Sequence, residues 1–96
     1  MRYTEGNSLK DVIGDFLDAK HIKGKLAEAN IIAKWNELVG EMIAKNTSKI
    51  YIHNNNLFLY IDSAALRQEL HYSKAKIISI INTEAGFELI KDVMVK

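Results

Sequence analysis

Apolar residues recur three and four positions apart near the start of the chain, which is the spacing of one helix face. Ser8 precedes this run and Asp11 follows three residues later, as in a capped helix N-terminus. We therefore expect a helix over about residues 8–19. Its apolar positions are Leu9, Val12, Ile13, Phe16 and Leu17.

The helical spacing returns after the segment KHIKGK, in which a glycine and three lysines predict a loop. A second helix is expected to run to about residue 45, and its apolar positions are Leu26, Ala29, Ile32, Trp35, Leu38, Val39, Met42 and Ile43. Glycine inside a helix costs roughly 0.5–1 kcal/mol relative to alanine. Gly40 therefore either ends one helix and begins a short third one, or lets a neighbouring backbone approach closely.

The period changes from helical to alternating at residue 49. In KIYIHNNNLFLYID every second residue is aliphatic, and three asparagines separate two such runs. We expect a β-hairpin whose inward face carries Ile50, Ile52, Leu57, Leu59 and Ile61.

A long amphipathic helix should follow the hairpin, capped by Asp62 or Ser63 and ending near Gly86. Its apolar positions are Leu66, Leu70, Ile77, Ile80 and Ile81. The closing segment FELIKDVMVK alternates again and predicts a last strand that docks on the hairpin.

The resulting order, α-α-(α)-β-β-α-β, predicts an α+β fold, a two-layer sandwich with helices packed on one face of a three-stranded sheet. No proline, internal repeat or low-complexity tract divides the chain. We expect a single domain over residues 1–96, with the option of a separate N-terminal helix at about residues 8–19.

Composition limits the classes of function. The absence of cysteine excludes disulfides, thiolate nucleophiles and cysteine-ligated metals. No signal-peptide or membrane-spanning run is present, so we expect a cytoplasmic protein, optionally nucleoid-associated, without membrane contact. His21, His53 and His71 lack metal-ligand spacing, and neither a phosphate loop nor a nucleophile elbow occurs. We therefore expect no enzyme activity, no metal and no cofactor.

Trp35, the single tryptophan, shares its apolar stripe with Leu38, Val39 and Met42. Aromatic residues dominate small cores, and a buried indole N–H needs only one acceptor. We expect Trp35 in the core rather than as a stacking platform for a ligand.

The outward face of the predicted sheet is unusually apolar, because a solvated face is normally polar. The residues that alternate with the buried set are Tyr51, His53, Phe58, Tyr60, Ile90 and Met94. Three explanations of this apolar face are open: the N-terminal helix folds back over it, a second subunit covers it in a homodimer, or single-stranded nucleic acid stacks on its rings. Tyr51 and Tyr60 carry hydroxyls and are the residues expected to be accessible.

Basic residues cluster although the formal net charge is only +1. Arg67, His71 and Lys74 stand at positions i, i+4 and i+7, so they line one face of the long helix. Lys45 and Lys49 bracket the entry to the hairpin, and further basic residues, Lys20, His21, Lys23 and Lys25, form a group in the predicted loop. These groups either are solvated flanks or contact phosphates in salt-sensitive, sequence-indifferent binding.

Taken along the whole chain, segments such as WNELVG and LFLYIDSAALRQEL resemble the DciA-like family, and most closely its short, stand-alone Bacteroidetes versions. The residues that carry the resemblance are Trp35, Leu38, Val39, Gly40, Asn46, Thr47, Leu57, Leu59, Ile61, Ser63, Leu66, Arg67, Glu69 and Leu70. The resemblance implies a KH-like fold, contact with the replicative helicase during helicase loading, and affinity for single-stranded or branched DNA.

The chain contains no G-x-x-G clamp, so nucleic acid must meet the basic flanks or the aromatic sheet face. Our first hypothesis is a non-enzymatic nucleic-acid-binding adaptor, in which basic residues contact phosphates and tyrosines stack. Its site residues are Arg67, His71, Lys74, Lys45, Lys49, Tyr51 and Tyr60. The alternative is a protein-interaction or dimerisation module without nucleic-acid binding, which uses the sheet face through Phe58, Ile90 and Met94 beside the two tyrosines.

Overall fold

The structure is a computed structural model of the chain that describes residues 22–96. The helix expected at about residues 8–19 lies outside the described residues. Residues 22–33 are helical. The elements that follow are α2 (Trp35–Val39), α3 (Glu41–Lys45), β1 (Thr47–His53), β2 (Asn56–Ile61), α4 (Ala64–Tyr72), α5 (Lys74–Ala85) and β3 (Asp92–Val95).

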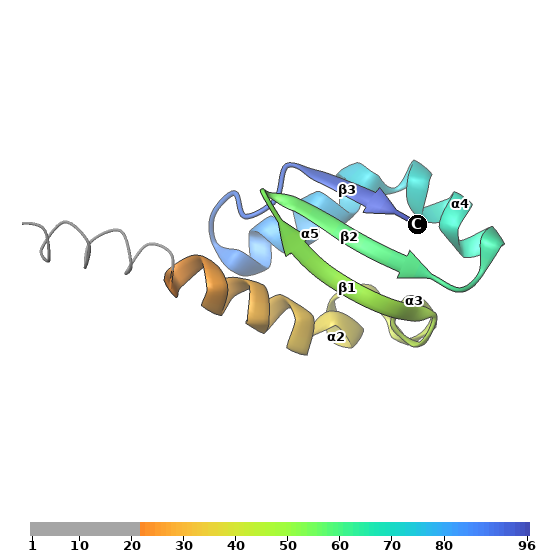
Figure 1. Cartoon of the computed structure of the whole chain (residues 1–96), viewed down its shortest axis with the longest axis horizontal. Coiled ribbons are helices and arrows are strands. Elements are labelled where there is room, and N and C mark those ends of the chain that lie inside the picture. Colours follow the sequence, from red (N-terminus) through yellow and green to blue (C-terminus); the bar gives the residue numbers. More distant parts are fainter. Residues whose placement is uncertain (1–21) are drawn as a thin grey trace, which may run out of the picture.

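The three strands form one mixed sheet in the order β1-β2-β3. β1 pairs antiparallel with β2, and β3 pairs parallel with β2 after the chain has crossed the sheet through α4 and α5. In Figure 1, α4 and α5 pass behind the sheet, and no described element crosses in front of it. The α+β fold with helices on one face of a three-stranded sheet is therefore confirmed.

The core lies between the sheet and these helices. Its fully buried side chains are Ile31, Leu57, Leu59, Ile81, Ile90 and Val93. Trp35 is only 5% exposed and belongs to the same cluster, so its expected place in the core is confirmed. Burial on this scale, at roughly 25 cal/mol per Å² of apolar surface, is the main stabilising term in a domain without cross-links.

The predicted hairpin is confirmed, with a two-residue turn. Asn54 and Asn55 both have positive φ, 51° and 64°, as a type I′ turn requires. Asparagine tolerates this left-handed conformation better than most residues. The third asparagine, Asn56, already belongs to β2, and the Asn55 side chain donates a hydrogen bond to the Leu89 carbonyl (2.9 Å).

The helix before α2 differs from the prediction in its start and in its buried face. Residues 22–25 are helical rather than part of a loop, so Lys23 and Lys25 lie on a helix. Ile31 is buried, whereas Leu26 and Ile32 are 66% and 40% exposed. Ile31 stands four residues before Trp35, about one helical turn, so the inward stripe runs through Ile31 rather than through Ile32.

Gly40 ends α2 and precedes α3, which decides between the two interpretations offered by the sequence. Its φ of 96° favours glycine, and no atom lies within 4 Å of the position that a Cβ would occupy. Close approach of another backbone is therefore not its role. The turn also places Met42 on the surface, 64% exposed, although the sequence pattern placed it in the core.

The expected long helix is two helices, because the chain breaks at Ser73 between α4 and α5. The Ser73 N–H bonds the Leu70 carbonyl in a tighter i−3 turn. The N-cap and the C-terminal end are as predicted: the Ser63 hydroxyl accepts from the Leu66 N–H (3.2 Å), and Gly86 is left-handed. The apolar stripe continues across the break, so the hydrophobic pattern gave no sign of it.

The segment before β3 is held by Asn82 of α5. Its Oδ1 accepts hydrogen bonds from the N–H groups of Leu89 (2.9 Å) and Ile90 (3.0 Å), and its Nδ2 donates to the Ile90 carbonyl (3.0 Å). The strand begins only at Asp92, after the segment that these three hydrogen bonds hold. Ile90 is 0% exposed, so its expected place on the outward face of the sheet is wrong.

Candidate nucleic-acid interface

The face of the sheet turned away from α4 and α5 carries the clearest chemical pattern in the described chain. Each strand places three residues on it, because alternate side chains of a strand point to the same side. We call this set the open face. Its members are Lys49, Tyr51 and His53 on β1, Asn56, Phe58 and Tyr60 on β2, and Asp92, Met94 and Lys96 at β3.

Strand register arranges these residues in rows across the sheet. Tyr51 pairs with Phe58, and Phe58 pairs with Met94. Lys96 lies beside Tyr60, because the Lys96 backbone bonds the Leu59 carbonyl (2.7 Å) and the Ile61 N–H (3.0 Å) on either side of it. Since Lys49 pairs with Tyr60 on the other edge, one row reads lysine, tyrosine, lysine.

The aromatic rings of the open face form a continuous stack. The rings of Tyr51 and Phe58 are 4.7 Å apart between centroids and inclined by 10°, and those of Tyr51 and Tyr60 are 6.4 Å apart. The Lys49 Nζ lies 5.3 Å from the Tyr51 ring and 5.4 Å from the Tyr60 ring, within cation–π range. All three rings are half-buried, and the ring faces and edges that the stack leaves uncovered lie beside a positive charge.

One phenol of the open face has a raised pKa. A hydrogen bond with the Tyr60 side chain, and secondarily burial, raise the pKa of Tyr51 above its ordinary value of 10.0. The Tyr51 phenol therefore adds no negative charge that would repel a phosphate.

Charge is distributed unevenly along the open face, with basic residues at one end and an acidic residue at the other. Lys49 and Lys96 flank Tyr60 at one end, whereas Asp92 stands in the row of Asn56 and His53 at the other. An anionic ligand that covers the rings is therefore attracted to the lysine end.

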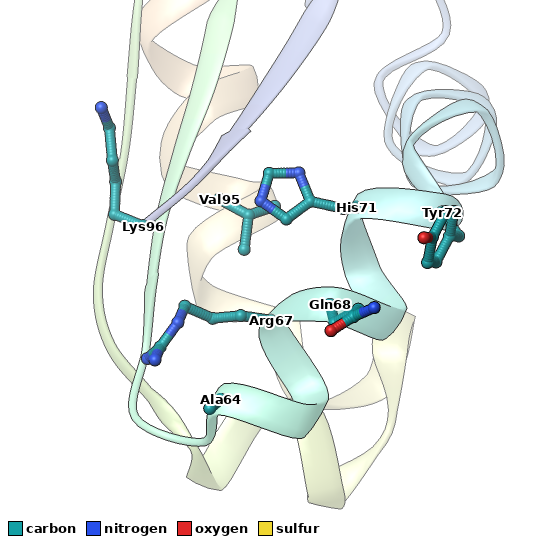
Figure 2. A pocket seen from close by; sticks show the side chains of 7 residues that line it. All are labelled: Ala64, Arg67, Gln68, His71, Tyr72, Val95 and Lys96. Carbon is teal, nitrogen blue, oxygen red and sulfur yellow. The ribbon is translucent and has the colours of Figure 1, made fainter.

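A second basic group lies around the edge of the sheet from Lys96. α4 and the end of β3 enclose an open hollow of about 520 Å³. Figure 2 shows Arg67 reaching from α4 toward the strands and His71 lying beside Val95, while the Lys96 side chain points away from His71. The lining residues are Ala64, Arg67, Gln68, His71, Tyr72, Val95 and Lys96.

Arg67 has a structural partner in this hollow. Its Nη1 donates to the Ile61 carbonyl at the end of β2, 2.5 Å away. This bond fixes the guanidinium at the corner where β2, α4 and Lys96 meet. Arginine carries five donors, and among residues 22–96 this is the hydrogen bond that its side chain makes, so other donors can meet an incoming oxyanion.

The other basic residues expected at the site lie on helices, outside the open face. Lys74 starts α5 beyond the break at Ser73 and does not line the hollow with Arg67 and His71. Lys45 ends α3, where a positive charge is favoured by the helix dipole. The Lys23 ammonium lies over the Phe87 ring (5.1 Å), away from the open face.

Lys96 was missed among the site residues, although the alternation of FELIKDVMVK had put it in register with Met94. Its distance from the other basic residues in the sequence concealed its place beside Tyr60. An apolar groove of about 680 Å³ between α2–α3 and α4–α5 was also unexpected. Its lining includes Leu38, Met42, Leu66 and Ile80.

Within residues 22–96, no three histidine or acidic side chains lie close enough to form a metal site. In the same part of the chain, no helix has the length and apolar character needed to cross a membrane.

Comparisons with known proteins cover nearly the whole chain. The model of a family described as "Dna[CI] antecedent, DciA" matches residues 8–95. A UPF0232 protein of Corynebacterium glutamicum (strain R) is 27% identical over 95 residues, which are 98% of this chain and 53% of that relative. The chain thus spans about half the length of the curated relative that it matches. No solved structure matches the chain.

Proposed function

Because the chain belongs to the DciA family, which is associated with loading of the replicative helicase, we propose that it is a non-enzymatic adaptor that binds single-stranded DNA and contacts that helicase. It acts in the cytoplasm, where the replicating chromosome lies. The observation that carries the DNA-binding part is the stacked aromatic surface of the open face, flanked by Lys49 and Lys96.

Stacking is the first step of the proposed binding mode. Bases of a single strand expose π faces that a paired duplex hides, and each base stacked on an aromatic side chain contributes about 1–3 kcal/mol. Tyr51, Phe58 and Tyr60 already stack on one another, so bases would extend this stack at the ring faces that it leaves uncovered. Branched DNA with a single-stranded arm offers the same bases.

Phosphate contacts are the second step. Lys49 and Lys96 stand on either side of Tyr60, where the backbone of a stacked strand would pass. From the Lys96 corner the strand can continue around the sheet edge to Arg67 and His71. These contacts carry no base information, so the binding is salt-dependent and indifferent to sequence.

The helicase contact rests on the family association. Its test is a pull-down of the replicative helicase from the native organism with the tagged chain, before and after nuclease treatment. Retention of the helicase after nuclease supports direct contact, whereas its loss would show that DNA bridges the two proteins.

DNA binding is tested by fluorescence anisotropy with a labelled single-stranded oligonucleotide at low and at physiological salt. Tyr51→Leu and Tyr60→Leu remove a ring but keep apolar bulk, and each should weaken binding about tenfold, the equivalent of one lost stacking contact. Phe87→Leu is the matched control, because it removes a ring that lies outside both the open face and the hollow lined by Arg67 and His71. Absence of binding at low salt would refute the proposal.

A second candidate, a protein-interaction or dimerisation module, is favoured by the apolar character of the same face. Phe58 and Met94 would then be its contact residues, whereas buried Ile90 would not. Sedimentation equilibrium separates the two. A dimer that Tyr51→Leu dissociates, in a chain that does not bind DNA, would favour the module over the adaptor.

A further inference from the structure

One apolar stripe on the described helices is exposed. Residues 22–33 turn Ile31 inward, and Lys34, just after the helix, pairs with Glu84 of α5 (3.1 Å), which fixes the inward side of this helix. The opposite side carries apolar residues with four-, three- and four-residue steps, the spacing of a helix–helix seam. They are Ile22, Leu26, Ala29 and Ala33, all exposed, and we call them the seam.

We propose that residues 8–19 of the same chain fold back as an antiparallel helix and cover this seam. Ile22 and Leu26 are 54% and 66% exposed. Each large apolar side chain gains about 1.5–3 kcal/mol on full burial, so an uncovered seam leaves much of this stabilisation unused. The adjoining segment carries a matching apolar stripe at helical spacing.

The length of residues 8–19 fits the seam. A helix of twelve residues is about 18 Å long, and the seam from Ile22 to Ala33 spans about 16 Å at 1.5 Å per residue. Lys20 and His21 provide the reversal, since connections of two residues are at the short end of those that join antiparallel helices.

Side-chain sizes match in the antiparallel register that such a short turn imposes. Ala33 then meets Leu9 and Ala29 meets Val12, so each alanine faces a larger residue, while Leu26 meets Phe16 in an apolar contact. On the reversal side Ile22 meets Ala19. Alternation of large and small residues across facing helices lets their axes approach closely.

Charge favours the same arrangement. Residues 8–19 contain three aspartates and one lysine, whereas the helix of residues 22–33 contains two lysines and one glutamate. The two segments therefore carry excess charge of opposite sign, which supports pairing of one with the other over pairing of either with a second copy of itself.

This inference is independent of DNA binding and concerns a different surface. If residues 8–19 occupy the seam, they do not cover the open face. The N-terminal helix, one of the three covers considered for the aromatic rings, is thereby placed on a different surface.

Paired cysteines test the contact cleanly, because the full chain contains no native cysteine. The Val12→Cys/Ala29→Cys variant should oxidise to a disulfide within one chain. The control variant, Val12→Cys/His53→Cys, places the second thiol on the open face. Oxidation should be about tenfold faster in the first variant, because thiols held across a helical hairpin have a high effective concentration. Mass spectrometry and non-reducing gels distinguish links within and between chains.

A preferential link to position 53 would overturn the proposal and place residues 8–19 on the sheet. A link formed only between chains would also overturn it and identify a second copy as the cover. Hydrogen exchange gives a second readout: Leu26→Asp, at an exposed position, should release protected amides in residues 8–19 and leave β1 and β2 protected. Unprotected amides in residues 8–19 of the unaltered chain would equally refute the contact.

Discussion

The indole Nε1 of Trp35 donates a hydrogen bond to the Thr47 Oγ1, 3.1 Å away. The same hydroxyl donates to the Ile43 carbonyl (2.7 Å), so one threonine joins α2, the end of α3 and the first residue of β1. The tryptophan is therefore oriented as well as buried. The single polar atom of its ring has the partner that a buried indole requires.

Replacing Thr47 by valine should destabilise the fold by about 1–2 kcal/mol, because valine keeps the shape but leaves the buried indole N–H without an acceptor. Urea unfolding followed by tryptophan fluorescence measures the loss. Thr47→Ser retains the hydroxyl and should cost less. Equal midpoints for Thr47→Val and the unaltered chain would contradict this role.

Asn82→Ala should cost about 2 kcal/mol, since it removes three hydrogen bonds of roughly 1 kcal/mol each and gains a little helix propensity. Ser79→Ala is the control on the same helix, because Ser79 is exposed. Chemical denaturation compares the two variants. Similar stabilities would show that Asn82 does not hold the segment before β3.

Two glycine substitutions should act in opposite directions. Gly24 lies in the helix with open space around its Cβ position, so Gly24→Ala should stabilise the chain by about 0.5–1 kcal/mol. Gly40 has a φ of 96°, so Gly40→Ala should destabilise it by about 1 kcal/mol or more. Thermal unfolding measures both. A stabilising Gly40→Ala would mean that the turn between α2 and α3 has a different backbone.

Lys49→Ala and Lys96→Ala should each reduce the slope of log affinity for single-stranded DNA against log salt by about 1, because each removes one phosphate contact. The control is Lys76→Ala, an exposed lysine of α5 on the other side of the molecule from the open face. If the control changes the slope as much as the two others, DNA does not follow the lysine end of the open face.

The alternating segments were predictable from sequence because a strand has only two faces. Once the inward residues of β1 and β2 were known, Tyr51, Phe58 and Tyr60 had to share the other face. The two-residue turn followed from the asparagines, which accept positive φ.

The helices were less predictable, because one helical stripe can be drawn through several neighbouring apolar residues. The adjacent residues Ile31 and Ile32 stand four and three positions before Trp35, so both fit a helical stripe with it, and only packing in the core decides that Ile31 is buried. The break at Ser73 left the spacing of Leu70 and Ile77 unchanged, so it had no hydrophobic signature.

The site was only partly predictable for a related reason. Extending the alternation of β3 backwards placed Ile90 on the open face. In the structure, the hydrogen bonds of the Asn82 side chain hold the backbone there in place of strand pairing. Lys96 comes beside Tyr60 only through the parallel pairing of β3 with β2, a contact between residues distant in the chain.

The open face is complete only after β3 has docked on the sheet. A hairpin forms from neighbouring residues, but a parallel third strand must wait until two helices have been laid down, since distant contacts form late. Met94 and Lys96 join the open face only when β3 docks beside β2. Until then the tyrosines stand without their second lysine, so in the proposed binding mode a gain of affinity for polyanions would report the docking of β3.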